Sequence, residues 1–113
     1  GAAGMAAARE IRGAGLSVAL IEREEFLGGI LMQCVHNGFG LRRFKKELTG
    51  PEYAGLCEEL VGDSGVDFYL DTTVIDAEVV QDGKTKVLTA LSADDGVLVF
   101  KTGCVVLAMG CRE

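Results

Sequence analysis

The sequence has no excess of positive charge, no long apolar run and no closely spaced cysteine pair, and each absence excludes a class of protein. Its 11 lysines and arginines are outnumbered by 17 acids, which gives a net charge of -6. A protein that binds nucleic acid normally carries a basic face. No apolar run approaches the roughly 20 residues that span a bilayer. We therefore expect neither a nucleic-acid partner nor a membrane span.

The four cysteines lack the spacing of a zinc site or of a dithiol pair. Cys34, Cys57, Cys104 and Cys111 form no C-x-x-C motif and no zinc-ribbon pattern. A metal at Cys34 and His36 would need two further ligands, which are not evident. We therefore expect free thiols, no bound metal and a reducing, cytoplasmic location.

Glycine, by contrast, is abundant, and its 16 residues are about twice the average share of roughly 7%. Several glycines occur in close pairs, such as Gly28–Gly29 and Gly38 with Gly40, which indicates fixed turns and not a flexible linker. With 49% hydrophobic residues, the chain is long enough for one domain with a modest core, which we expect to span residues 1–113.

The first 22 residues predict a helix followed by a short buried strand that ends in an acid. Ala2–Arg12 is rich in alanine, and Ser17–Glu22 is almost wholly apolar. Gly1 and Gly4 fit the second and third glycines of the G-x-G-x-x-G motif of nucleotide-binding βαβ units. The first glycine and the strand before it are missing, so we expect the chain to begin inside this motif.

This arrangement predicts a nucleotide site. The N-terminus of a helix offers unpaired N–H groups and the positive end of its dipole, which together stabilise a phosphate. Glu22 lies 18 residues after Gly4, close to the spacing expected for an acid that binds a ribose. Gly28–Gly29 follows shortly and allows close approach of the backbone to a cofactor, although an ordinary turn is the alternative.

The middle of the chain contains the only basic cluster and a well-marked helix start. Gln33–Gly40 is predicted to be a loop. Arg42–Lys46 contains four cations, which form either a solvated helix face or a surface that attracts an anionic substrate or partner. Thr49–Glu52 combines a capping residue, a first-turn proline and a capping-box acid. The apolar stripe that follows contains Cys57, which we expect to be a core thiol.

The second half of the chain predicts strands. Val66–Leu70 should extend a parallel sheet, and Cys104–Ala108 should form another buried strand. Between them, three runs separated by Asp-Gly turns predict an antiparallel meander over about residues 73–102. These runs are Thr73–Val80, Lys84–Leu91 and Val97–Lys101.

The predicted fold class is therefore α/β, a Rossmann-like parallel sheet with an inserted three-stranded antiparallel meander. We expect the missing first strand to belong between Ser17–Glu22 and Cys104–Ala108.

This order of motifs resembles the FAD-binding domain of the pyridine nucleotide-disulfide oxidoreductase superfamily over nearly the entire chain. The resemblance rests on the glycine motif, the acid, Leu27-Gly28-Gly29, the meander and Leu107-Ala108-Met109-Gly110. The last three residues resemble the Ala-Thr-Gly motif of that superfamily, with Met109 in place of Thr. The stretches Gly-Gly-Ile-Leu-x-Gln-Cys-x-His-x-Gly-Phe-Gly-Leu and Leu-Thr-Gly-Pro-Glu-Tyr-Ala are similar to a bacterial group of NAD(P)/FAD-dependent oxidoreductases linked with glycerol 3-phosphate oxidation.

The resemblance implies FAD as the cofactor and assigns its contacts. The glycine motif would face the pyrophosphate, Glu22 would bind the adenosine ribose, and Arg23 would flank the adenine. The double glycine would lie near the phosphate and ribityl groups, Val74 would pair its backbone with adenine, and residues 108–110 would close over the cofactor. The implied cofactor-binding residues are thus Gly1, Ala2, Ala3, Gly4, Glu22, Arg23, Gly28, Gly29, Val74, Ala108, Met109 and Gly110.

The chain departs from the superfamily in two ways. Only Cys34 is present where dithiol members carry two cysteines, which disfavours disulfide reductase chemistry, and the NAD(P)-binding half is absent. Cys34 is a candidate redox thiol, and His36 is a candidate proton donor that would favour the thiolate. An inert cysteine and a loop histidine that only donates or accepts a hydrogen bond are the alternatives. Cys111 is a further residue that would approach the cofactor.

The implied function is the FAD-binding part of a flavin-dependent oxidoreductase that passes electrons between NAD(P)H and a second small molecule. Because of the basic cluster, an anionic substrate is one alternative for this second molecule. The remaining segments of a longer protein would be its partners, and activity of this chain alone is not expected. The alternative is a non-catalytic nucleotide-binding fragment with little or no affinity for FAD. An NAD-only Rossmann domain would continue with more βα repeats, not with a meander.

Overall fold

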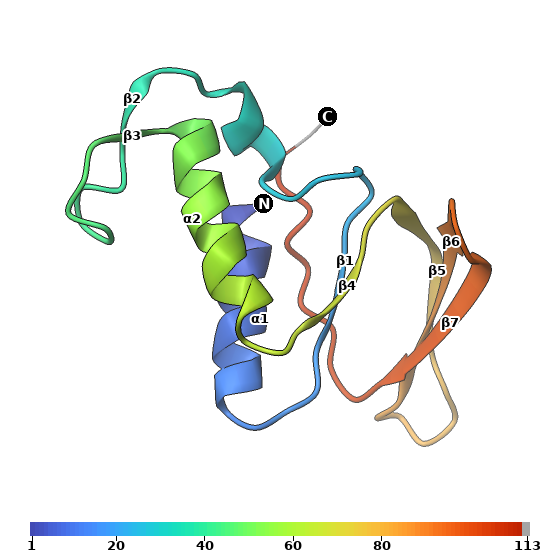
Figure 1. Cartoon of the computed structure of the whole chain (residues 1–113). Coiled ribbons are helices and arrows are strands. Elements are labelled where there is room, and N and C mark those ends of the chain that lie inside the picture. The colour runs from blue at the N-terminus through green and yellow to red at the C-terminus, as the bar shows by residue number, and fades with distance from the viewer. Residues whose placement is uncertain (112–113) are drawn as a thin grey trace.

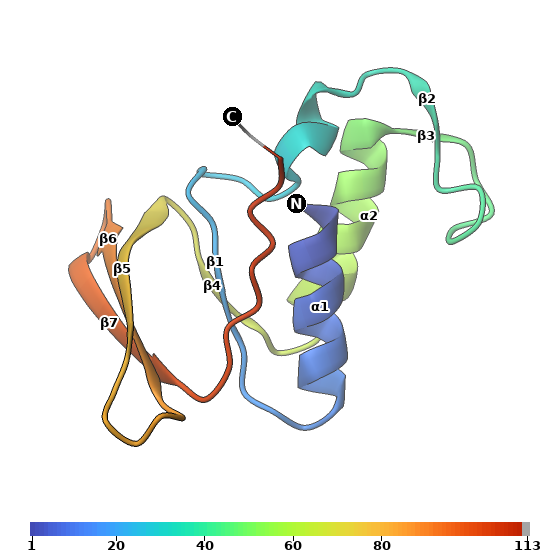
Figure 2. The same cartoon turned by 180° about the vertical axis from the view of Figure 1, so that it is seen from behind.

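The computed structural model describes residues 1–111, which form an elongated body of 48 × 29 × 25 Å. Figure 1 shows two helices side by side, a pair of short strands in the middle and an antiparallel meander at one end. A hairpin loop forms the opposite end, as the reverse view in Figure 2 also shows. The elements thus separate into a helical half, which contains the N-terminus, and a meander half.

Helix α1 (Ala2–Gly13) forms because alanines dominate its sequence, and it buries Met5 and Ala8. It ends where Gly15 takes a positive φ of 88°, a conformation that glycine adopts without steric cost. The predicted helix over residues 2–12 is confirmed.

Helix α2 (Gly50–Gly62) begins with the predicted capping box. The backbone N–H of Thr49 donates to Glu52 Oε2 at 2.7 Å, and the N–H of Glu52 donates to Thr49 Oγ1 at 3.4 Å. The backbone N–H of Thr49, together with its hydroxyl, lowers the pKa of the Glu52 carboxyl below its ordinary value of 4.5.

Replacing Thr49 tests this cap. Thr49→Ala should lower the free energy of unfolding by about 1 kcal/mol at pH 7, because one side-chain acceptor of the first turn is lost. Since the folded pKa of Glu52 is depressed, its contribution is present above the unfolded pKa and is lost as the pH falls through the folded value. The loss should therefore be smaller at pH 3 than at pH 7 in urea unfolding. An equal loss at both values would contradict the coupling of Thr49 to the ionised acid.

The main core lies between the two helices and the strands beneath them. Its buried members are Met5, Ala8, Leu27, Cys57, Val61 and Val66. Cys57 is only 3% exposed, which confirms the predicted core thiol.

The central strands form a small parallel pair. Strand β1 (Ala19–Ile21) pairs with β4 (Asp67–Tyr69), with Ala19 opposite Asp67 and Ile21 opposite Tyr69. The parallel relation of the two predicted segments is confirmed, although both strands are shorter than predicted.

The meander is confirmed as a three-stranded antiparallel sheet. It consists of β5 (Thr72–Val79), β6 (Lys86–Ser92) and β7 (Gly96–Thr102) in the order β5-β6-β7. The first turn is closed by the Asp82 carboxylate, which accepts the N–H groups of Lys84 and Thr85 at 2.8 and 2.7 Å. The ring of Phe100 on β7 contacts Tyr69 edge-on at 4.8 Å and so joins the meander to the central pair.

The prediction that residues 33–40 form a loop was wrong in part. The 3-10 helix η1 (Gly29–Gln33) precedes β2 (Asn37–Phe39), which pairs antiparallel with β3 (Leu48–Thr49). Strand β3 leads directly into α2 at Gly50, whose N–H donates to the carbonyl of Cys34 at 2.7 Å. The two segments pair because both are held by the start of α2, a tertiary constraint that local periodicity does not report.

The predicted buried strand Cys104–Ala108 was also wrong. Within the described residues 1–111 this segment belongs to no sheet, and Val106 and Leu107 are 58% and 74% exposed. Cys104, expected in the core, is exposed. An apolar run becomes a buried strand only where another strand supplies its hydrogen bonds, and no such partner lies beside it in residues 1–111.

Among residues 1–111, no helix has the length and apolar character that a membrane crossing requires.

Candidate functional site

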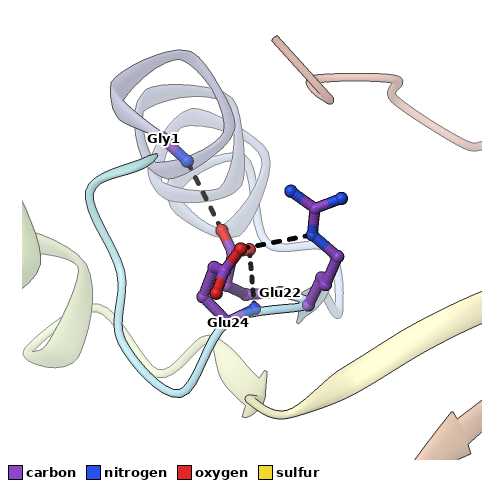
Figure 3. A network of polar contacts seen from close by, with 4 residues as sticks. Gly1, Glu22 and Glu24 are labelled. Carbon is purple, nitrogen blue, oxygen red and sulfur yellow. Dashed lines mark hydrogen bonds and ion pairs between the residues drawn. The ribbon is translucent and has the colours of Figure 1, made fainter. Parts of the chain in front are cut away.

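Three segments meet at the N-terminus of α1. The nitrogen of Gly1 lies 3.7 Å from Glu22 Oε2, as Figure 3 shows. From another side Gly29 approaches so closely that a Cβ built on it would lie 3.2 Å from Gly1 Cα. The structure therefore brings together the helix tip, the acid after β1 and the second residue of the double glycine.

Backbone hydrogen bonds at the end of β1 hold Glu22 in place. Its N–H donates to the carbonyl of Tyr69 at 2.9 Å, and its own carbonyl accepts the N–H of Thr72 at 3.0 Å. Its side chain is 17% exposed, and Oε1 accepts the N–H of Glu24 at 3.1 Å. The carboxylate is thus fixed at the carboxyl end of the parallel pair, where open α/β sheets bind their ligands. No sequence motif indicates the contributions of Tyr69 and Thr72, because the backbone makes both hydrogen bonds.

No side chain at the tip of α1 accepts a hydrogen bond from the first N–H groups of the helix. Gly1 is the N-cap, no side chain caps the helix, and the first turn contains no acid. The first N–H groups of a helix lack partners within the helix, and the helix dipole is positive at this end. The tip is therefore a set of backbone donors with Glu22 as the neighbouring carboxylate.

The two residues of the double glycine have different roles. Gly28, with a φ of 115°, packs against η1 and α2, where a Cβ would lie 2.9 Å from Met32 Sδ and 3.1 Å from Ala54 Cβ. Gly29, with a φ of 57°, approaches the helix tip. Gly29 is therefore the closer of the two to the candidate site, whereas the carbonyl oxygen of Gly28 lies 3.8 Å from a Cβ built on Gly1. The contact of Gly28 with Ala54 was not predicted.

The C-terminal segment reaches the first turn of α1. A Cβ built on Gly4 would lie 3.4 Å from the Cβ of Ala108, so the small residues allow the segment to lie against the helix. Met109, which follows, is 80% exposed, and Gly110 has a positive φ of 76°. Ala2 is half-buried and Ala3 is exposed on the same first turn.

Two of the predicted cofactor residues lie on neighbouring elements. Arg23 is 56% exposed and pairs with Glu24, with Nε 3.3 Å from Oε1. Val74 lies on β5 opposite Ala90 and is 42% exposed. Strand β5 is an edge strand among the described residues, so one side of its backbone faces away from the meander.

Cys34 and His36 have separate partners. The thiol of Cys34 donates to the carbonyl of Ile30 at 3.4 Å, whereas Nδ1 of His36 lies 3.0 Å from the carbonyl of Asn37. The imidazole packs on Phe39 with 5.3 Å between ring centroids. The structure thus shows each side chain in a local contact, with no hydrogen bond between them. Cys111, the other candidate thiol, is exposed.

No protein-family profile and no curated protein sequence matches the chain. Among solved structures, L-proline dehydrogenase from P. horikoshii is 29% identical with a TM-score of 0.73, over 97% of this chain and 21% of that one. BexE, studied for oxidation during BE-7585A biosynthesis, is 20% identical with a TM-score of 0.72, over 91% of this chain and 28% of that one. AlpK is 14% identical with a TM-score of 0.68 and the same two coverages.

The chain therefore spans about a fifth to somewhat over a quarter of the length of these proteins. The similarity to BexE and AlpK is one of fold alone. The chain has the fold of a segment that occurs in an L-proline dehydrogenase, which by its name is an oxidoreductase.

Proposed function

We propose that residues 1–113 are the FAD-binding part of a flavin-dependent oxidoreductase. The observation that carries the proposal is the meeting of the α1 tip, Gly29 and Glu22 at the carboxyl end of β1. The similarity to a segment of L-proline dehydrogenase supports the oxidoreductase class.

The residues at the tip fit the pyrophosphate and the ribose of an adenosine diphosphate group. The uncapped N–H groups of α1 suit the pyrophosphate, because the helix dipole and these donors favour an anion. The short side chains of residues 1–4 let the backbone approach the phosphates closely. Glu22, held beside the tip, can accept hydrogen bonds from ribose hydroxyl groups.

When bound, FAD would supply the electron transfer, and the protein would supply binding and orientation. In this proposal Gly29 limits the space beside the first phosphate, and Ala108 covers the first turn of α1 from the other side. Arg23, Val74, Met109 and Gly110 would complete the contacts.

The finer assignment follows from the resemblance. The complete protein would belong to the pyridine nucleotide-disulfide oxidoreductase superfamily and would pass electrons between NAD(P)H and a second small molecule. The bacterial group linked with glycerol 3-phosphate oxidation is the nearest assignment. The NAD(P)-binding and substrate-binding parts would lie on further segments. Cys34 and His36 remain candidates for catalysis, although each has only local partners here.

A non-catalytic nucleotide-binding fragment is the second candidate. It is favoured by the exposed apolar side chains of Val106 and Leu107, because the segment that leads to Ala108 is not packed in a sheet among residues 1–111. Such a fragment would bind the ADP part of a nucleotide and gain nothing from the isoalloxazine ring.

Replacing Glu22 tests the proposal. We expect FAD to bind the chain weakly, and Glu22→Gln to weaken binding about tenfold, because a hydrogen bond to a charged acceptor contributes about 1.5–3 kcal/mol. Isothermal titration with FAD and with ADP measures this, and Glu25→Gln is the control because it removes the same charge from an exposed side chain. No heat with either nucleotide, or equal weakening by both variants, would contradict the site. ADP binding as tight as FAD binding would favour the second candidate.

A further inference from the structure

The four cations of the basic cluster lie on a protruding loop, which we call the basic loop (residues 41–47). It joins β2 to β3 and forms the end of the molecule opposite the meander in both Figures 1 and 2. Its cations are exposed, and among residues 1–111 none of them forms an ion pair. The cations are Arg42, Arg43, Lys45 and Lys46. The loop therefore presents a dense positive charge to the solvent.

The charge of the basic loop is opposite to that of the rest of the chain. Outside the loop the chain has seven cations and 16 acids, because Glu47 is the only one of the 17 acids that lies within the loop. Lys46 lines a hollow of about 290 Å³ together with Glu52 and Glu59. Arg42, Arg43 and Lys45 do not line this hollow. The molecule thus has one positive end and a negative body.

The loop has a fixed shape. Phe44 packs edge-on against Tyr53 of α2 at 5.3 Å between ring centroids, and its N–H donates to the carbonyl of Gly40 at 2.8 Å. The guanidinium of Arg43 lies 5.5 Å from the centre of the Phe44 ring. Lys45 has a φ of 57°, in the left-handed region that a lysine rarely adopts. The cations are therefore displayed on an anchored turn and not on a flexible tail.

The loop also exposes one large apolar side chain beside its cations. Leu41 is 57% exposed and directly precedes Arg42. An apolar side chain next to a group of cations suits the boundary of an anionic lipid layer, where the charges meet headgroups and the apolar group enters the acyl region.

We propose that the basic loop docks the protein on an anionic membrane surface. A protein partner is disfavoured because a stable interface buries about 800 Å² on each side, more than a convex tip of seven residues offers. A flat lipid surface needs only the tip. The negative charge of the body does not prevent this approach. Charges beyond a Debye length of about 8 Å are largely screened at physiological salt, and the molecule extends 48 Å, so much of the body lies beyond that distance from the loop.

Flotation with vesicles tests the proposal. The wild-type chain should bind vesicles that mix phosphatidylserine with phosphatidylcholine, should not bind phosphatidylcholine alone, and should be released by high salt. The triple variant Arg42→Gln/Arg43→Gln/Lys45→Gln should lower the partition coefficient about a hundredfold, since each cation near such a surface is worth about a fivefold change. Leu41→Ser should lower it several-fold.

Matched controls separate the loop from total charge and total apolar exposure. Arg9→Gln/Lys84→Gln/Lys101→Gln removes the same charge from exposed positions elsewhere, and Leu16→Ser replaces a leucine that is 61% exposed outside the loop. Neither control should change binding more than about twofold, and circular dichroism should show all variants folded. Absent binding to anionic vesicles, or an equal loss in the control triple, would overturn the proposal. Loop-dependent binding of polyglutamate without vesicle binding would assign the loop to an acidic protein instead.

Discussion

Gly50→Ala should destabilise the protein by about 3 kcal/mol or more, because the added methyl group has no space. A Cβ at this position would overlap the carbonyl oxygen of Leu31 and lie 2.6 and 2.8 Å from the carbonyl oxygen and Cβ of Cys34. These are mostly backbone atoms, which cannot move aside as the end of a flexible side chain can. The change would also disturb the N–H of Gly50, which joins α2 to the segment before β2. Denaturant unfolding measures the loss.

Gly55→Ala is the matched control for this prediction. It lies in the same helix, and a Cβ there would meet no atom within 4 Å. Because alanine loses less backbone entropy than glycine in a helix, this variant should be more stable than wild type by about 0.5–1 kcal/mol. If both variants changed stability equally, the packing of Gly50 against Leu31 and Cys34 would not be the cause.

Gly28→Ala should both destabilise the protein and abolish measurable binding of FAD. The positive φ of 115° disfavours alanine, and the added Cβ would lie 2.9 Å from Met32 Sδ and 3.1 Å from Ala54 Cβ. We expect a cost of about 2–4 kcal/mol from strain and overpacking together. Because Gly28 holds the loop against α2, its displacement would also move Gly29 relative to the tip of α1. Unfolding and FAD titration of the same sample measure the two effects.

Gly83→Ala isolates the backbone part of this effect. Its φ is 70°, also positive, but a Cβ there would meet nothing within 4 Å. It should cost only about 1 kcal/mol, the strain of a left-handed residue, and leave FAD binding unchanged. A loss of FAD binding in Gly83→Ala would show that Gly28 acts through global stability and not through its position next to the site.

Much of the fold could be predicted from the sequence where the signal is local. The Thr49–Glu52 cap is encoded in four consecutive residues, and the meander in β-branched runs joined by Asp-Gly turns, so both were predicted correctly. The parallel relation of β1 and β4 also followed, because a helix between two apolar runs favours a right-handed crossover.

The rest could not be predicted because it depends on partners distant in the sequence. Cys104–Ala108 has the composition of a buried strand, but among residues 1–111 no strand provides the hydrogen bonds that would make it one. The β2–β3 pair was missed for the opposite reason. Its two short strands have little strand propensity of their own and pair because Gly50 and Phe44 hold them together.

The position of Glu22 beside the tip of α1 could be predicted from the sequence, whereas the packing around the double glycine could not. The spacing of Gly4 and Glu22 indicated that the acid would lie beside the helix tip, and the structure brings them to the same end. The division of work between Gly28 and Gly29 depends on the walls formed by Met32 and Ala54, which no local motif encodes. Likewise, the two-residue spacing of Cys34 and His36 suggested a pair, whereas each side chain contacts a backbone carbonyl.

The place where Gly1, Gly29 and Glu22 meet contains a single functional side chain, and its other parts are backbone atoms. Ligand recognition at this place therefore depends mainly on backbone groups, which are accessible because the glycines lack side chains. At Gly28 and Gly29 every possible amino-acid replacement adds the same Cβ to a left-handed, crowded position, so almost any random mutation is harmful whatever its polarity. Such a site is sensitive to mutation at these two glycines, although they carry no side chain that a designed substitution could improve.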